Sequence, residues 1–109
     1  MREFVTFLVR NPAFVTRNAR RTWAVRKAMA EHKKAHPFCA YTGKTTALHV
    51  HHVRPVSTAP ELAAEPTNFI TLNADAHLHV AHAGDWNSCV PNIREVCSAR
   101  VIQRTKAAE

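Results

Sequence analysis

Histidine is concentrated in one stretch of this sequence. Six of the eight histidines lie between residues 49 and 82, namely His49, His51, His52, His77, His79 and His82. Imidazole is the commonest side-chain ligand of transition metals, and its pKa lies nearest to neutrality. The cluster therefore predicts a metal site, a general base, or both in one place.

Two short strands are expected to carry part of this cluster. Residues 48–53 alternate with the period of two that a half-buried strand shows, and residues 68–72 form a short apolar run of strand type. Prolines at positions 55, 60 and 66 mark the connection as a loop with room for one helical turn. The doubled histidine His51-His52 thus falls at the end of the first strand.

Three helices are expected around these strands. Residues 16–35 have helical spacing and end before Pro37, which disfavours helix at the residue preceding it. Asp75 is the expected cap of a helix over residues 76–82, with Gly84 as its stop. A last helix opens at Pro91-Asn92, and its apolar face is formed by Ile93, Val96, Cys97 and Val101. Trp23 and Trp86 are expected to anchor the core, and the alternative is that they are platforms on which nucleobases stack.

The net positive charge lies in the first third of the chain. Residues 1–36 hold nine basic and two acidic residues, whereas six of each balance over the rest. A cationic helix suits a polyanion such as DNA, bound mainly through its phosphate backbone, although a solvated basic face kept for solubility has the same composition. The candidate DNA contacts are Arg17, Arg20, Arg21, Lys27 and Arg54.

Cysteine and hydropathy patterns exclude several other classes. The three cysteines, Cys39, Cys89 and Cys97, form no Cys-x-x-Cys pair, so we expect buried, reduced thiols rather than a disulfide framework. The longest apolar stretches, residues 4–9 and 69–72, are far shorter than a membrane-spanning helix. A cytoplasmic protein of one domain, without membrane association, is therefore expected.

The segment from Ala35 to Asn92 resembles the HNH endonuclease family, the ββα-metal nucleases. The resemblance lies in an ordered set: a doubled histidine ending a strand, a proline three residues on, an asparagine opening the second strand, and a helix with paired histidines. The stretch Asp-Trp-Asn-Ser after the last histidine is similar to one branch of that family. The resemblance implies an α+β fold with a ββα-metal core in residues 37–92, a basic helical extension in residues 1–36 and a C-terminal helix in residues 93–109.

Carried over by position, the resemblance also implies roles for individual residues. His51 would bind the metal, and His52 would be the general base that takes a proton from the attacking water. Asn68 would orient that base or brace the loop between the strands. His77 and His82 would complete the metal ligands. Helical spacing alone favours His79 with His82, so His79 is the alternative ligand or a phosphate contact.

One departure from the family concerns a second metal. Many members hold a structural zinc with two Cys-x-x-Cys pairs, of which only Cys39 is present here, with Thr42, Asn73 and Ala76 at the other three positions. We therefore expect no four-cysteine zinc and one divalent ion in the histidine site, either Zn²⁺, Ni²⁺ or Co²⁺ or the weaker binders Mn²⁺ or Mg²⁺.

The resemblance implies a DNA endonuclease or nickase that hydrolyses phosphodiester bonds. Free-standing members of the family are frequent in bacteriophages and bacteria, which implies the cytoplasm of a bacterium or an infected host cell. The alternative is a non-catalytic module of the same fold that binds nucleic acid or a protein. A third possibility is a regulatory protein that only binds metal, but this role would not explain the excess of positive charge in residues 1–36.

Overall fold

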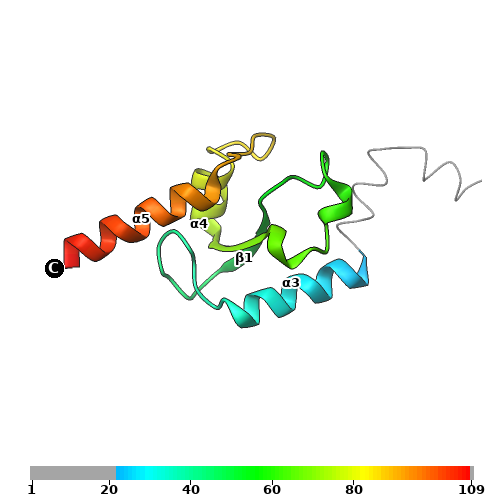
Figure 1. The fold of residues 1–109 in the computed structure, drawn as a ribbon, viewed down its shortest axis with the longest axis horizontal. Helices are drawn as coiled ribbons and strands as arrows, with labels where there is room; N and C mark the ends of the chain where they lie inside the picture. Colours follow the sequence, from blue (N-terminus) through cyan, green and yellow to red (C-terminus); the bar gives the residue numbers. More distant parts are fainter. Residues whose placement is uncertain (1–21, 109) are drawn as a thin grey trace, which may run out of the picture.

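A two-stranded antiparallel sheet lies at the centre of the fold (Figure 1). The computed structural model describes residues 22–108, in which β1 (Leu48–His52) pairs with β2 (Phe69–Asn73). His51 lies opposite Ile70, and His52 lies opposite Phe69. Both predicted strands are confirmed, the second displaced by one residue. Together with the helices below, they make a mixed α+β fold.

The first described helix, α3 (Trp23–Ala35), begins at a side-chain cap and ends before a proline. The Thr22 hydroxyl accepts the Val25 N–H at 3.3 Å, and Thr22 itself has an extended backbone. His36, which precedes Pro37, ends the helix as predicted. The prediction of one continuous helix from residue 16 is wrong at Thr22, and residues 16–21 lie outside the described residues.

The two faces of the sheet are covered by different helices. Successive strand residues point to opposite faces, so His49 and His51 share one face and His52 lies on the other. On the second face, the Phe69 ring lies 5.2 Å from the His52 ring and 5.5 Å from the ring of His32 in α3. Figure 1 shows α3 running beside the sheet. The face of His49 and His51 is therefore left for the helices that follow β2.

The helix after β2 begins earlier than predicted and changes its hydrogen-bond pattern. The Asn73 side chain, and not Asp75, caps it by accepting the Ala76 N–H at 3.0 Å. A single α-helical turn, α4 (Ala74–Ala76), leads directly into a five-residue π-helical segment, η3 (His77–Ala81). Gly84 has a φ of +83° and donates its N–H to the Leu78 carbonyl at 2.8 Å, which closes the helix as predicted.

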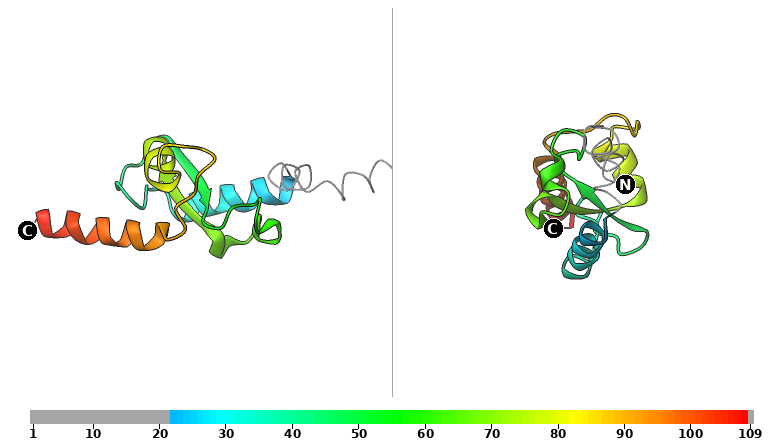
Figure 2. Two further views of the ribbon diagram at one scale, coloured as in Figure 1. Left: turned by 90° about the horizontal axis from the view of Figure 1, so that it is seen from above. Right: turned by 90° about the vertical axis from the view of Figure 1, so that its right-hand side faces the viewer.

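The main core forms where this helix meets the sheet and the last helix. α5 (Ile93–Ala108) contributes only its first turns, and the rest extends away from the sheet (Figures 1 and 2). Val101 is 42% exposed, so its predicted place on a buried face is wrong. The residues buried in this core are Cys39, Ile70, Leu72, Ala76, Ala81, Ile93 and Cys97.

The loop between the strands has a smaller core of its own. It contains two 3₁₀ turns, η1 (Pro60–Leu62) and η2 (Pro66–Asn68), the first at the predicted helical turn. Val56 and Ala63 pack there against Val25 and Met29 of α3. Within residues 22–108, none of the helices has the length and apolar character needed to cross a membrane.

Candidate metal centre

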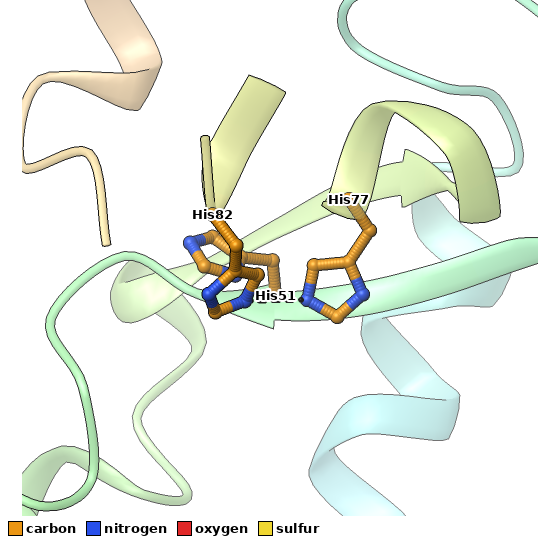
Figure 3. Close-up of side chains that lie close together, drawn as sticks. All are labelled: His51, His77 and His82. Atoms are coloured by element: carbon orange, nitrogen blue, oxygen red, sulfur yellow. Dashed lines mark hydrogen bonds between the residues drawn. The ribbon is translucent and has the colours of Figure 1, made fainter. Parts of the chain in front are cut away.

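Three histidines from two elements converge on one point (Figure 3). His51 comes from β1, His77 begins η3, and His82 follows the end of η3. One ring nitrogen from each lies within 4.8 Å of those of the other two, and the Nε2 atoms of His77 and His82 are 3.2 Å apart. Two nitrogens that bind one tetrahedral zinc ion are about 3.4 Å apart. The spacing therefore fits a shared metal ion.

The π-helical segment explains why residues five apart can meet. On an ideal α-helix His77 and His82 would point about 140° apart. Here the His82 N–H instead donates to the His77 carbonyl at 3.2 Å, an i to i+5 bond that brings the two residues onto the same side of the helix. His79, favoured by α-helical spacing, is exposed and does not belong to the converging group.

Backbone hydrogen bonding determines which nitrogen of His82 is available. Its Nδ1 lies 2.6 Å from the carbonyl oxygen of Ser88, which can only accept a hydrogen bond. Nδ1 of a neutral ring therefore carries the proton, and the lone pair is on Nε2, the atom that faces His77. Metal-binding histidines usually donate their second ring N–H in this way.

His77 has an equivalent partner in a histidine that sequence reasoning left without a role. The Nδ1 atoms of His49 and His77 are 3.1 Å apart. When Nε2 of His77 binds a metal, Nδ1 carries the proton and donates it to His49. The spacing of two between His49 and His51 was the available signal, because it places both on the same face of β1.

The third ligand, His51, is the most deeply buried of the three. Its side chain is 3% exposed, and its Nε2 is buried without a hydrogen-bond partner. An unpartnered polar atom is costly in a protein interior, and coordination to a metal would satisfy a ring nitrogen lone pair. This unsatisfied nitrogen fits a metal ligand better than it fits a packed core residue.

Burial and repulsion from neighbouring rings keep the rings of His51 and His77 uncharged at neutral pH. The pKa of His51 falls to about 3, first through burial and then through three neighbouring rings, those of His77, His82 and His52. Burial lowers the pKa of His77 to about 4, with contributions from His82, His49 and His52. A metal ion can therefore bind both rings without first displacing protons.

The proposed general base and the asparagine occupy neighbouring but separate places. The Nε2 of His52 lies 2.8 Å from the carbonyl oxygen of Ala63 and must donate to it, which leaves the lone pair of a neutral ring on Nδ1. Asn68 is 5% exposed. Its Oδ1 accepts the Arg54 N–H at 2.8 Å. Its Nδ2 donates to the carbonyl oxygens of Arg54 and Leu62. Its hydrogen bonds brace the loop after β1.

The positions of the absent zinc cysteines form a hydrogen-bonded network. The Cys39 thiol lies 3.7 Å from Oδ1 of Asn73 and accepts the Thr42 N–H at 3.3 Å. The same Asn73 oxygen accepts the Ala76 N–H. Two local pairs that are far apart in sequence, Cys39 with Thr42 and Asn73 with Ala76, are thus tied together beside the start of α4. Cys39 is fully buried, and all three cysteines are free.

Trp86 was missed as a neighbour of the site. Its ring lies 5.0 Å from the His77 ring and 4.9 Å from the His82 ring, centre to centre. The prediction that Trp23 and Trp86 anchor the core is wrong, since they are 69% and 57% exposed. The largest fully buried side chains are instead those of Phe69, Leu72, Ile93 and Cys39.

Basic residues lie near the site on α3. A groove of about 440 Å³ lies between α3 and β1, and Arg26, Lys33, His49 and His77 are among the residues that line it. Lys27 is exposed but engaged with Glu31 at 4.0 Å and with the Trp23 ring. Arg54 is exposed just beyond β1. The other candidate DNA contacts, Arg17, Arg20 and Arg21, lie outside the described residues.

No protein-family model matches this sequence, and neither a curated protein nor a solved structure gives a significant match. The functional argument therefore rests on the residues of the site and their geometry.

Proposed function

We propose that this protein is a metal-dependent DNA endonuclease or nickase of the HNH, ββα-metal type. The observation that carries the proposal is the convergence of His51, His77 and His82, together with a fourth histidine, His52, which follows His51 in β1 and whose tautomer is set by a backbone carbonyl. A purely structural metal site has no need of such a neighbour. A hydrolase needs both a Lewis acid and a base.

The fold around the site supports this assignment. The order is strand, strand, helix, and the doubled histidine ends the first strand while the other two ligands lie on the helix. The network of Cys39, Thr42, Asn73 and Ala76 joins the four positions that the family fills with zinc cysteines. These hydrogen bonds connect the loop before β1 to the start of α4, as the structural zinc does in the family.

The histidine site fits a divalent ion by its donor set, its spacing and the unsatisfied nitrogen of His51. A bound ion would stabilise negative charge on the phosphate and on the departing oxygen. Three imidazoles bind Zn²⁺, Ni²⁺ and Co²⁺ more tightly than Mn²⁺ or Mg²⁺. The ion that supports turnover is therefore sought among all five.

His52 is the candidate general base. Its Nδ1 takes a proton from water, the water oxygen forms a bond to phosphorus, and the bond from phosphorus to the departing ester oxygen breaks, that oxygen taking a proton from solvent. Donation from Nε2 to Ala63 keeps the Nδ1 lone pair in place for this transfer. Asn68 contributes indirectly, because it holds Arg54 and the loop that contains Ala63.

Charge near the site supports a polyanionic substrate. Arg26 and Lys33 line a groove that His77 also lines, and Arg54 follows the doubled histidine. A phosphodiester backbone in this groove would meet these two cations and one of the three metal ligands, His77. Such contacts bind DNA with little sequence preference and weaken steeply with salt.

The test is cleavage of supercoiled plasmid by the full chain with Mg²⁺, Mn²⁺, Co²⁺, Ni²⁺ and Zn²⁺ in turn. The variant His52→Ala should lose at least about 100-fold in rate and keep its metal affinity, since general-base catalysis contributes that much or more. The variant His79→Ala changes an exposed histidine of η3 outside the converging group; it is the matched control and should cleave normally. DNA binding without cleavage by any of the five ions would refute the nuclease and favour a non-catalytic binding module.

A further inference from the structure

Trp86 is held in an unusual position for a tryptophan. More than half of its surface is exposed, at 57%, yet its ring contacts two of the three metal ligands, His77 and His82. Tryptophan side chains are highly buried on average, so a solvent-exposed indole beside a reactive centre calls for an explanation. If such a ring binds a flat apolar partner, its exposed face is removed from water, which is favourable.

The loop that carries Trp86 is fixed on both sides of it. Asp85 donates its N–H to the His82 carbonyl at 2.9 Å, and the Asp85 side chain accepts the Asn87 N–H at 2.9 Å. The Ser88 N–H donates to the Asp85 carbonyl, and the Ser88 carbonyl receives the Nδ1 proton of His82. The indole is therefore presented by a braced turn that is tied directly to a metal ligand.

We propose that Trp86 is a stacking platform for an unpaired nucleobase next to the scissile phosphate, so that the preferred substrate is single-stranded or locally unpaired DNA. The inference rests on the proposed function and names the substrate class of the same site. Every nucleobase has an apolar face that stacks on an aromatic ring, so the platform needs no base sequence. A base inside a duplex is already stacked on both faces and must leave the helix before it can reach the ring.

A simpler role would be to shield the metal ligands from water. A shield would alter metal affinity when removed and would not distinguish between forms of DNA. A stacking platform would alter the affinity for unpaired DNA at unchanged metal affinity. The two roles therefore differ in measurements that can be made without any cleavage.

The experiment uses the full chain with Trp23→Phe and His52→Ala, in which Trp86 is the only tryptophan and cleavage is suppressed. The metal-loaded protein is titrated with a short oligothymidylate, the same strand in a duplex, and a strand of abasic sites, while Trp86 fluorescence is followed. We expect the single strand to quench Trp86 and to bind more tightly than the other two. Replacing Trp86 by Ala should weaken the affinity for the single strand about tenfold, and Trp86→Phe should recover part of it. A gel shift measures both affinities, because these variants have no tryptophan.

The control variant is Phe38→Ala, which removes a half-exposed aromatic ring from a groove that contains none of the three metal ligands. It should leave single-strand affinity unchanged. Equal affinities for the oligothymidylate and the abasic strand, or a Trp86→Ala change confined to metal affinity, would overturn the inference while leaving the nuclease intact. Selective quenching by the single strand, with no ion supporting cleavage in the unmodified chain, would uphold Trp86 as a stacking platform for unpaired DNA and refute the nuclease.

Discussion

Acidification should destabilise the metal-free protein well above the pH at which carboxylates titrate. His51 and His77 have a pKa of about 6.5 in an unfolded chain, whereas burial and neighbouring rings lower the folded values to about 3 and about 4. Between these limits the unfolded chain binds protons that the folded chain does not. The stability contributed by the neutral rings is complete above pH 6.5 and is lost as the pH falls toward 4 and 3.

The magnitude follows from the shift. One pH unit below the unfolded pKa corresponds to about 1.4 kcal/mol for a ring that stays neutral in the folded state. At pH 5 this amounts to about 2 kcal/mol for His51 alone. His77 adds less than this value, because its ring is only partly buried and solvent screens its charge, so about 3 kcal/mol is expected for the pair. A loss of this size is a large fraction of the stability of a small domain.

Urea unfolding followed by circular dichroism, at pH 7 and pH 5 with a chelator present, measures this loss directly. The variant His51→Asn removes the ring that accounts for most of the loss and should reduce the difference between the two pH values by about two thirds. His79→Asn changes an exposed histidine of η3 and should retain the full difference. Equal stability of the unmodified protein at both pH values, or an unchanged difference in His51→Asn, would refute the assignment of neutral, buried rings.

Three further predictions concern residues around the ligands. Replacing His49 by Ala should weaken metal affinity about tenfold, through loss of the acceptor for His77, and His49→Asn should restore part of it; competition with a coloured chelator measures both. Asn68→Ala removes three hydrogen bonds from a buried amide and should cost about 3 kcal/mol of unfolding free energy in urea. His79→Ala should leave the absorption spectrum and affinity of bound Co²⁺ unaltered, and a change in either would return His79 to the ligand set.

The periodicity of apolar residues and the positions of glycine and proline were sufficient to predict the sheet and the general position of the site. Alternation over residues 48–53 defined the face of His49 and His51, and the helix stop at Gly84 was correctly placed. Asn73 could not be distinguished from Asp75 as the cap, because both side chains accept the same kind of hydrogen bond. The choice depends on where β2 ends, which tertiary pairing decides.

The helical geometry of the site lay beyond sequence reasoning for a physical reason. An α-helical and a π-helical turn differ by the shift of one hydrogen-bond acceptor, and no side chain in residues 77–81 encodes that shift. The carbonyls of Ser88 and Ala63, which set the tautomers of His82 and His52, belong to the backbone and so have no signature in the residue type. Trp86 was misjudged because its hydrophobicity predicts burial, whereas it is 57% exposed and lies against the rings of His77 and His82.

The same features that prepare the site for a metal also weaken the fold in its absence. His51 is buried with an unsatisfied nitrogen, and its ring is surrounded by others that make its protonation unfavourable. The π-helical segment lacks the regular i to i+4 bonding of an α-helix, and it lies between α4, which Asn73 caps, and the closing bond from Gly84 to the Leu78 carbonyl. Metal binding to the folded state alone would offset this cost. With metal present, stability and metal affinity should therefore fall together in variants of the ligands, whereas variants of His52 should keep their metal affinity, as the assignment of His52 as base rather than ligand requires.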